Sequence, residues 1–279
     1  MNSFKFGTVG SPLSTPKTPG GSVGAIIRIA HLGLQAIELG WVQSVRISES
    51  TCASIKAAGN EHQVAISVHA PYYINLNANV DEWPKSRQRL LDAAYYGYLA
   101  GATDIVFHPG SYFGLPAEEV LLTAKVRLKE CANFLLGKGV QVTLRPETMG
   151  KSALLGSLED TLELSRSIEG VEPCLDFAHL HARRGDGSLN TAQEWGEILN
   201  IYASVLGDDA LKRLHIHLSG IEYSAKGEKN HLPIQESDFN LKGLFQALRV
   251  KDCGGRILCE SPILEDDALM MQSLWNKIG

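Results

Sequence analysis

The chain has 279 residues, of which 44% are apolar and 20% are charged. This composition supplies enough apolar side chains for a substantial core and excludes intrinsic disorder as the general description. The formal net charge of -5 gives no overall attraction for polyanions, so any binding of nucleic acid must depend on a local site.

The five cysteines are odd in number and widely spaced, and none forms a Cys-x-x-Cys pair. This pattern argues against a disulfide scaffold and a cysteine zinc site, and it favours reduced thiols in a reducing cytoplasm. No apolar run approaches the ~20 residues needed to cross a bilayer, and the N-terminus lacks a signal-peptide pattern. We therefore expect a soluble, cytoplasmic monomer with no membrane contact.

Short apolar, β-branched segments alternate with longer segments of helical periodicity along the whole chain. Strands are predicted near residues 4, 36, 64, 104, 140, 173, 213 and 256. Helices are predicted over residues 22–33, 48–59, 83–101, 117–138, 157–168, 191–205, 238–250 and 265–277. Pro84 suits the first turn of the third helix because that position needs no amide partner. Glu265, Asp266 and Asp267 suit the positive N-terminus of the last helix.

Repeated strand–helix units predict an α/β fold with a parallel sheet, and eight units in one domain predict a (β/α)8 TIM barrel. No low-complexity tract or long linker divides the chain, so we expect one domain over residues 1–279. The alternative is an open, doubly wound sheet. It has less support because no Gly-x-Gly-x-x-Gly follows the first strand and the SPLSTPKTPGG loop lacks the spacing of a phosphate cradle.

Histidines and acids gather at the C-terminal ends of the predicted strands. In a barrel these ends meet at one mouth, where catalytic groups lie. The candidate ligands are His69, His108, Glu147, Asp176, His217 and Glu260 at strand ends, His179 just beyond Asp176, and Glu228 and His231 in the long loop after the seventh strand. Their donors suit zinc, manganese or ferrous iron, and so many carboxylates would repel one another without cations. The pattern therefore predicts a metal site.

A single histidine or acid at a strand end is more often a hydrogen-bonded structural residue than a ligand. Five histidines and four acids at one end of one barrel outweigh that interpretation. Glu38, His181 and His215 are expected to support the site rather than to bind the metal. Nine ligands are too many for one ion, and Glu147, at the central strand position, is the natural bridge in a two-metal hydrolytic site.

The motifs SVHAPYYINL, FHPGSY, RPETMGK, LDFAH, HIHLSG, GEKNH and LCES follow one another along the chain. In this order and at these separations, they resemble the endonuclease IV family of apurinic/apyrimidinic (AP) DNA endonucleases over essentially the entire chain. The resemblance implies a zinc-dependent phosphodiester hydrolase of base excision repair. Such an enzyme cleaves damaged double-stranded DNA on the 5′ side of an abasic site and leaves a 3′-hydroxyl.

The resemblance also implies three zinc ions, with manganese or iron as alternatives at one or more sites. It divides the ligands into three groups: His69, His108 and Glu147; Glu147, Asp176, His217 and Glu260; and His179 and His231 with an acid from the same loop. Glu147 would in addition hold and orient the attacking water. The family has Asp-Arg-His where this chain has Glu228-Lys229-Asn230-His231, so the acid ligand of the third ion departs from the family pattern.

Tyr72 and Tyr73 match family positions whose side chains enter the duplex, and such wedges unstack and bend DNA. Lys151, Arg183 and Lys226 lie in loops on the same predicted face, where they could bind phosphates. Ordinary packing above the barrel is the alternative for the tyrosines, and solvation is the alternative for the charged side chains.

Two other functions stay open. Sugar isomerases and epimerases of the xylose isomerase-like group resemble this chain at Glu147, Asp176, His217 and Glu260, a set that would hold a single divalent metal. The additional histidines and the pair Tyr72-Tyr73 favour the nuclease. A damage-binding protein without turnover is the third hypothesis, because the Glu228 loop departs from the family pattern.

Overall fold

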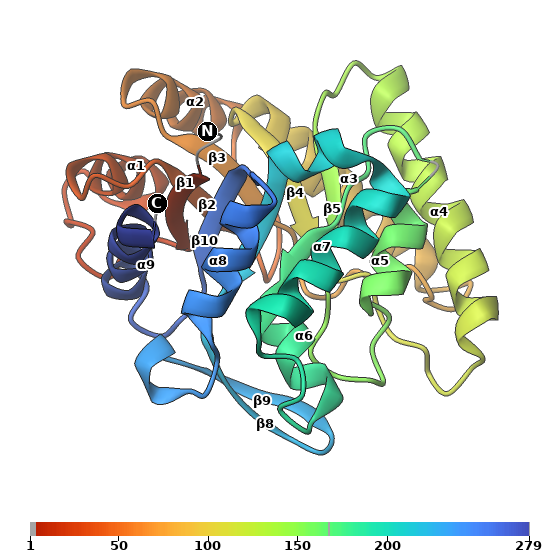
Figure 1. Cartoon of the computed structure of the whole chain (residues 1–279). Helices are drawn as coiled ribbons and strands as arrows, with labels where there is room; N and C mark the ends of the chain where they lie inside the picture. Colours follow the sequence, from red (N-terminus) through yellow and green to blue (C-terminus); the bar gives the residue numbers. More distant parts are fainter. Residues whose placement is uncertain (1–3, 167, 279) are drawn as a thin grey trace.

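The computed structural model describes residues 4–166 and 168–278, in which eight parallel strands form a barrel (Figure 1). The strands are β1 (Phe4–Val9), β2 (Ala36–Gly40), β3 (Ala65–His69), β4 (Ala102–Phe107), β5 (Thr143–Pro146), β6 (Cys174–Asp176), β7 (Leu214–Leu218) and β10 (Gly255–Cys259). Their order is β5-β4-β3-β2-β1-β10-β7-β6. Parallel bridges from Leu144 to Val171 and from Glu147 to Cys174 join the two ends of the sheet. The predicted (β/α)8 barrel is confirmed, while one domain over residues 1–279 stays a prediction.

The helices that alternate with the strands cover the outside of the barrel (Figure 1). They are α1 (Gly21–His31), α2 (Glu49–Glu61), α3 (Trp83–Leu99), α4 (Ala117–Gly137), α5 (Leu158–Ser165), α7 (Ala192–Leu206), α8 (Leu241–Val250) and α9 (Glu265–Ile278). The predicted end signals are present, with proline in the first turn of α3 and three acids in that of α9. Within the described ranges, no helix combines the length and apolarity needed to span a membrane.

The interior of the barrel is polar at its floor, below the mouth. Arg145 Nε lies 2.7 Å from Asp104 Oδ1, and Arg256 lies 2.8 Å from Asp104 Oδ2. Burial raises the pKa of Asp104, but the two guanidinium groups outweigh it and hold this pKa well below its usual range. The apolar core therefore lies mainly between strands and helices, where Phe4 and Phe245 pack edge-to-face against Trp275.

Two elements at the mouth differ from the sequence prediction. Helix α6 (Phe177–Arg184) begins directly after β6, because the Asp176 side chain accepts a hydrogen bond from His179 N and caps the helix. The segment after β7, predicted as a loop, contains the antiparallel hairpin of β8 (Gly220–Ser224) and β9 (Gly227–Leu232). The hairpin projects from the barrel below α6 in Figure 1. Both elements bring side chains to the mouth that the strands alone do not supply.

Candidate metal centre

All nine candidate ligands lie at the mouth, but they come from three kinds of position. Three of them lie on strands: His69, Asp176 and His217. Three directly follow strands: His108, Glu147 and Glu260. The last three lie on α6 or β9: His179, Glu228 and His231. The parallel sheet therefore aligns six of them by register, while α6 and the hairpin supply the remainder.

Glu147 is the centre of this arrangement and is fully buried. Its Oε2 lies 3.2 Å from His69 Nε2 and 3.3 Å from His108 Nε2. Its Oε1 lies 3.3 Å from His217 Nδ1 and 3.5 Å from His179 Nδ1. Burial raises the pKa of Glu147, but the imidazoles outweigh burial and hold this pKa well below its usual range. Glu147 is thus a buried carboxylate anion between four imidazoles.

Three overlapping groups each offer ligand atoms that lie within 4.8 Å of one another. They are His69, His108 and Glu147; Glu147, Asp176, His217 and Glu260; and Asp176, His179 and His231. Glu147 belongs to the first two groups, and Asp176 belongs to the last two. A carboxylate that two groups share can bridge two cations, because each of its oxygens can bind one ion.

The environment of Asp176 fits a divalent cation. Its Oδ2 is buried and accepts no hydrogen bond from the residues that the structure describes, although His179 Nδ1 lies 3.3 Å away. Burial, together with the nearby Glu260 and Glu147 carboxylates, raises the pKa of Asp176 to about 6. A buried carboxylate oxygen without a donor is costly, and a bound cation would compensate it. The nitrogen and oxygen donors of the whole set suit zinc, manganese or iron.

Glu228 faces the same site because β9 contains a bulge. His179 Nε2 lies 3.2 Å from His231 Nε2 and 3.6 Å from Glu228 Oε2. Tyr223 pairs with Glu228 but Glu222 pairs with Asn230, so Lys229 is an extra residue in β9. Regular alternation would put Glu228 and His231 on opposite faces, whereas one extra residue puts them on the same face. Lys229 instead pairs with Glu222 at 3.0 Å on the exposed side.

The loop under the hairpin makes room for this carboxylate. Glu228 N donates to the Gly150 carbonyl at 3.0 Å. A Cβ on Gly150 would lie only 2.6 Å from Glu228 Cβ, so glycine permits this close approach.

His179, on the other side of the site, has a raised pKa. Burial lowers the pKa of His179, but the Asp176 and Glu147 carboxylates outweigh burial and raise this pKa to about 9.

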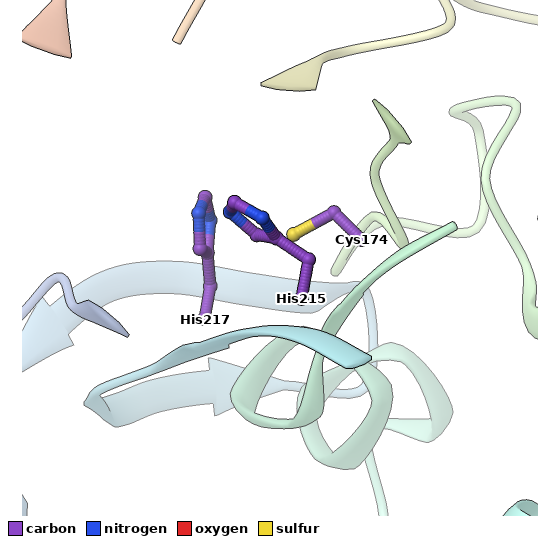
Figure 2. Close-up of side chains that lie close together, drawn as sticks. All are labelled: Cys174, His215 and His217. Carbon is purple, nitrogen blue, oxygen red and sulfur yellow. The ribbon is translucent and has the colours of Figure 1, made fainter. Parts of the chain in front are cut away.

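A fourth group lies deeper in the barrel and comprises Cys174, His215 and His217 (Figure 2). Figure 2 shows the two imidazoles of β7 side by side, with the Cys174 sulfur of β6 close to them. All three residues are buried, and burial raises the pKa of the Cys174 thiol. His217 belongs both to this group and to the group of Glu147, Asp176 and Glu260, so the two groups adjoin. His181 lies apart from the centre, 3.0 Å from Asp238 Oδ1.

The two tyrosines at the mouth have different surroundings. The Tyr72 ring is stacked on His108 with centroids 4.9 Å apart, and it meets His69 edge-on at 5.3 Å. Tyr73 instead points toward Arg89, whose guanidinium lies 5.8 Å from the ring centroid, and its hydroxyl donates to Gln43 at 3.3 Å. Tyr72 therefore covers the histidines, and Tyr73 lies outside them.

The three basic residues predicted to bind phosphates also differ in their surroundings. Lys151 and Lys226 are exposed at the loop after β5 and at the hairpin tip. The Arg183 guanidinium donates to the carbonyls of Met149, Lys151 and Leu154 at 2.6–3.0 Å. Arg183, which is predicted in a loop, therefore lies on α6 and binds the loop that carries Lys151.

Six of the nine candidate ligands line a cavity of about 350 Å³ whose wall also contains apolar residues. Its lining residues are Val9, His69, Tyr72, His108, Met149, His179, Glu228, His231 and Glu260. The sequence pattern does not single out Val9 or Met149, because an apolar side chain carries no signal of chemistry. The site is thus a pocket lined by both polar and apolar side chains.

Residues 26–274 match the family model described as xylose isomerase-like TIM barrel. The chain belongs to this family. An uncharacterized protein of Methanocaldococcus jannaschii is 37% identical over 274 residues, which cover 98% of this chain and 97% of that protein. A Bacillus subtilis protein named "Probable endonuclease 4" is 30% identical over 213 residues, which cover 72% of this chain and 68% of that protein.

Solved structures with this fold include enzymes of two classes. The crystal structure of endonuclease IV from Thermus thermophilus matches with a TM-score of 0.76 and 21% identity, covering 99% of this chain and 100% of that chain. A D-tagatose 3-epimerase-like protein matches with a TM-score of 0.73 and 18% identity, covering 99% of this chain and 98% of that chain. At these identities the likeness shows the fold. The family resemblance predicted from the motifs is confirmed by the sequence relatives.

Proposed function

We propose that this protein is a zinc-dependent AP endonuclease of base excision repair. It would hydrolyse the phosphodiester on the 5′ side of an abasic site in double-stranded DNA and leave a 3′-hydroxyl. The observation that carries the proposal is the set of three overlapping ligand groups around Glu147, which exceeds what one metal ion can use. A cytoplasmic location belongs to the same proposal and suits the five free thiols.

The proposed ligands follow the groups that the geometry brings together. The first ion would be held by His69, His108 and Glu147; the second by Glu147, Asp176, His217 and Glu260; and the third by His179, His231 and Glu228. Glu228 is included because the bulge in β9 directs its carboxylate to His179. Asp176 is the second acid within reach of the third ion. Manganese or iron could replace zinc at one or more of these positions.

Bound divalent metals would lower the pKa of a water and offset the charge on the phosphate. The chain's own catalytic residue would be Glu147. Its two oxygens lie among four imidazoles, and its ionised state lets it accept a hydrogen bond from the attacking water and orient that water. The Tyr72 ring over His108 and the Met149 side chain would limit the access of other waters to the cavity.

Recognition of the lesion would use one tyrosine and a small set of cations. Tyr72 is half-exposed at the pocket rim, so its ring could enter the gap left by a missing base. Lys151 and Lys226 could bind phosphates, while Arg183 would act through the loop it holds. Tyr73 would contribute less, because its ring lies toward Arg89. Three dications would also offset the formal net charge of -5 next to the DNA.

A sugar isomerase or epimerase with one divalent metal is the second candidate. The group of Glu147, Asp176, His217 and Glu260 is by itself a complete four-ligand site for one ion. A D-tagatose 3-epimerase-like protein also shares the fold. This alternative leaves the two other ligand groups without a role.

The deciding experiment uses a 5′-labelled duplex with a single abasic site and protein loaded with zinc. We expect one nick on the 5′ side of the lesion and a product that a DNA polymerase can extend, and prolonged chelation should abolish both. An undamaged duplex is the substrate control. The nuclease proposal fails if zinc-, manganese- and iron-loaded protein all leave the lesion strand intact. Aldose–ketose or epimer interconversion with manganese would then support the sugar enzyme, and tight lesion binding without nicking would support the damage-binding protein.

A further inference from the structure

A fully buried carboxylate on β2, Glu38, lies beneath the metal centre. Its Oε2 accepts a hydrogen bond from Ser67 Oγ at 2.8 Å and lies 2.9 Å from His215 Nε2. Its Oε1 lies 3.1 Å from His217 Nε2. One carboxylate thus contacts both imidazoles of β7, and only His217 is a candidate ligand.

The two ring nitrogens of His217 face different groups. Nδ1 lies 3.3 Å from Glu147 Oε1 and 3.3 Å from Glu260 Oε1, which are candidate ligands of the second ion. Nε2 faces Glu38. A neutral imidazole carries a proton on one nitrogen and a lone pair on the other, and only the lone pair can bind a metal. His217 can therefore serve the second ion through Nδ1 only when Nε2 carries the proton.

We propose that Glu38 is a positioning residue whose carboxylate accepts the Nε2 proton of His217 and so directs the Nδ1 lone pair to the second metal ion. Oε1 is within hydrogen-bond distance of Nε2, but the angle is not aligned in this structure. Glu38 fulfils this role only if the hydrogen bond from Nε2 to Oε1 forms. The inference rests on the metal-binding part of the proposed function and does not require DNA cleavage.

The surroundings of Glu38 hold its carboxylate in place. Beyond it, His215 Nδ1 lies 3.9 Å from Asp104 Oδ1, and Asp104 is paired with Arg145 and Arg256. Within this network Asp104 contacts His215, which is not a candidate ligand. Interior positions of such barrels are usually filled by branched apolar residues, and a buried carboxylate is costly unless it is paired. An acid at this position is explained if the metal centre needs it.

The test measures zinc binding without DNA, by competition with a chromophoric chelator. Glu38→Ala should weaken one zinc equivalent by about 10–100-fold, because loss of a partner behind a ligating histidine has this typical effect. Glu38→Gln should retain most of the affinity, since its amide oxygen can still accept the Nε2 proton. Asp104→Asn is the control, because Asp104 is a second buried acid in the barrel that does not touch His217. This variant should lower the stability of the metal-free protein but change zinc affinity by less than about threefold.

Nitrogen-15 NMR of the histidine rings supplies a second readout that packing alone does not move. In zinc-loaded wild-type protein, His217 should carry its proton on Nε2, and the resonance of this proton should show the downfield shift of a hydrogen bond to a carboxylate, which Glu38→Ala should remove. If Glu38→Ala does not fold, the wild-type Nε2–H resonance and the Glu38→Gln affinity decide the question.

A proton on Nδ1, unchanged zinc affinity in Glu38→Ala, or an equal loss in Asp104→Asn would each overturn the inference. Failure to bind zinc would overturn it as well. Failure to nick DNA with normal zinc binding would overturn only the nuclease proposal.

Discussion

Replacing Glu147 by glutamine removes one negative charge from the middle of the ligand set and leaves the side chain nearly the same size. The carboxylate is fully buried, and its oxygens lie 3.2–3.5 Å from four imidazoles. An amide cannot bridge two cations as a carboxylate does, and its NH₂ group would face an imidazole or a metal ion. We therefore expect Glu147→Gln to lose both metal affinity and the hydrogen-bond acceptor for the attacking water.

The expected loss of nicking rate in Glu147→Gln follows from the burial of the Glu147 carboxylate. Breaking a buried charge pair costs about 3–5 kcal/mol. If the transition state loses this much stabilisation, the nicking rate should fall by about 10²–10⁴-fold, because each tenfold change in rate corresponds to ~1.36 kcal/mol. Circular dichroism should still show the folded barrel, because the substitution leaves the apolar core untouched.

The assay is single-turnover nicking of the abasic-site duplex, with the metal content of each preparation measured in parallel. Glu172→Gln is the matched control, since it removes one carboxylate from ion pairs with Arg145 and Arg213, away from the ligand set. We expect it to cleave at nearly the wild-type rate. If Glu147→Gln cleaves as fast as Glu172→Gln, Glu147 is neither a bridge nor the residue that orients the water.

Three further predictions concern the rim of the site. Glu228→Ala should remove the third metal equivalent, whereas Lys229→Ala, on the opposite face of β9, should not; full metal content in Glu228→Ala would assign the acid role to Asp176 alone. Tyr72→Ala should weaken binding to the lesion by about 1–3 kcal/mol of stacking energy, with less effect on intact duplex, and equal losses on the two DNAs would reduce Tyr72 to packing. In metal-free protein the pKa of His179 is raised to about 9, so zinc must displace its proton, and zinc affinity from competition titrations should rise up to about pH 9.

The same pKa also predicts the stability of the metal-free protein. A histidine pKa raised above its ordinary value stabilises the folded state fully below about pH 6.5. This contribution is lost as the pH rises through about 9. Thermal unfolding of chelated protein should therefore show a falling contribution of His179 over this range, and His179→Ala should reduce the pH dependence. An unchanged pH profile in that variant would contradict the electrostatic account of the site.

The strand-end residues could be predicted from the sequence because barrel geometry converts chain order into spatial position. His69, His108, Glu147, Asp176, His217 and Glu260 sit at or just after strand ends, so the alternation of elements is enough to bring them to one mouth. The sequence pattern places His179 just beyond the end of the sixth strand. The structure places it on α6, because the Asp176 carboxylate caps a helix there.

Side-chain directions in the hairpin and loops could not be predicted in the same way. Whether Glu228 or Lys229 faces the site depends on a single bulge, and a bulge is a property of pairing between two strands. The different directions of Tyr72 and Tyr73 depend on contacts with His108 and Arg89, which are distant in sequence. Three backbone carbonyls occupy the donors of Arg183, and no sequence pattern indicates that contact.

The number of metal ions bound to each chain tests the central claim most directly. Elemental analysis of purified protein, after removal of loosely bound ions, should give more than two equivalents, mainly zinc. The proposed function, in which each of three overlapping ligand groups holds one ion, predicts this result. A value near one equivalent, with manganese preferred, would contradict the account and favour the single-metal sugar enzyme.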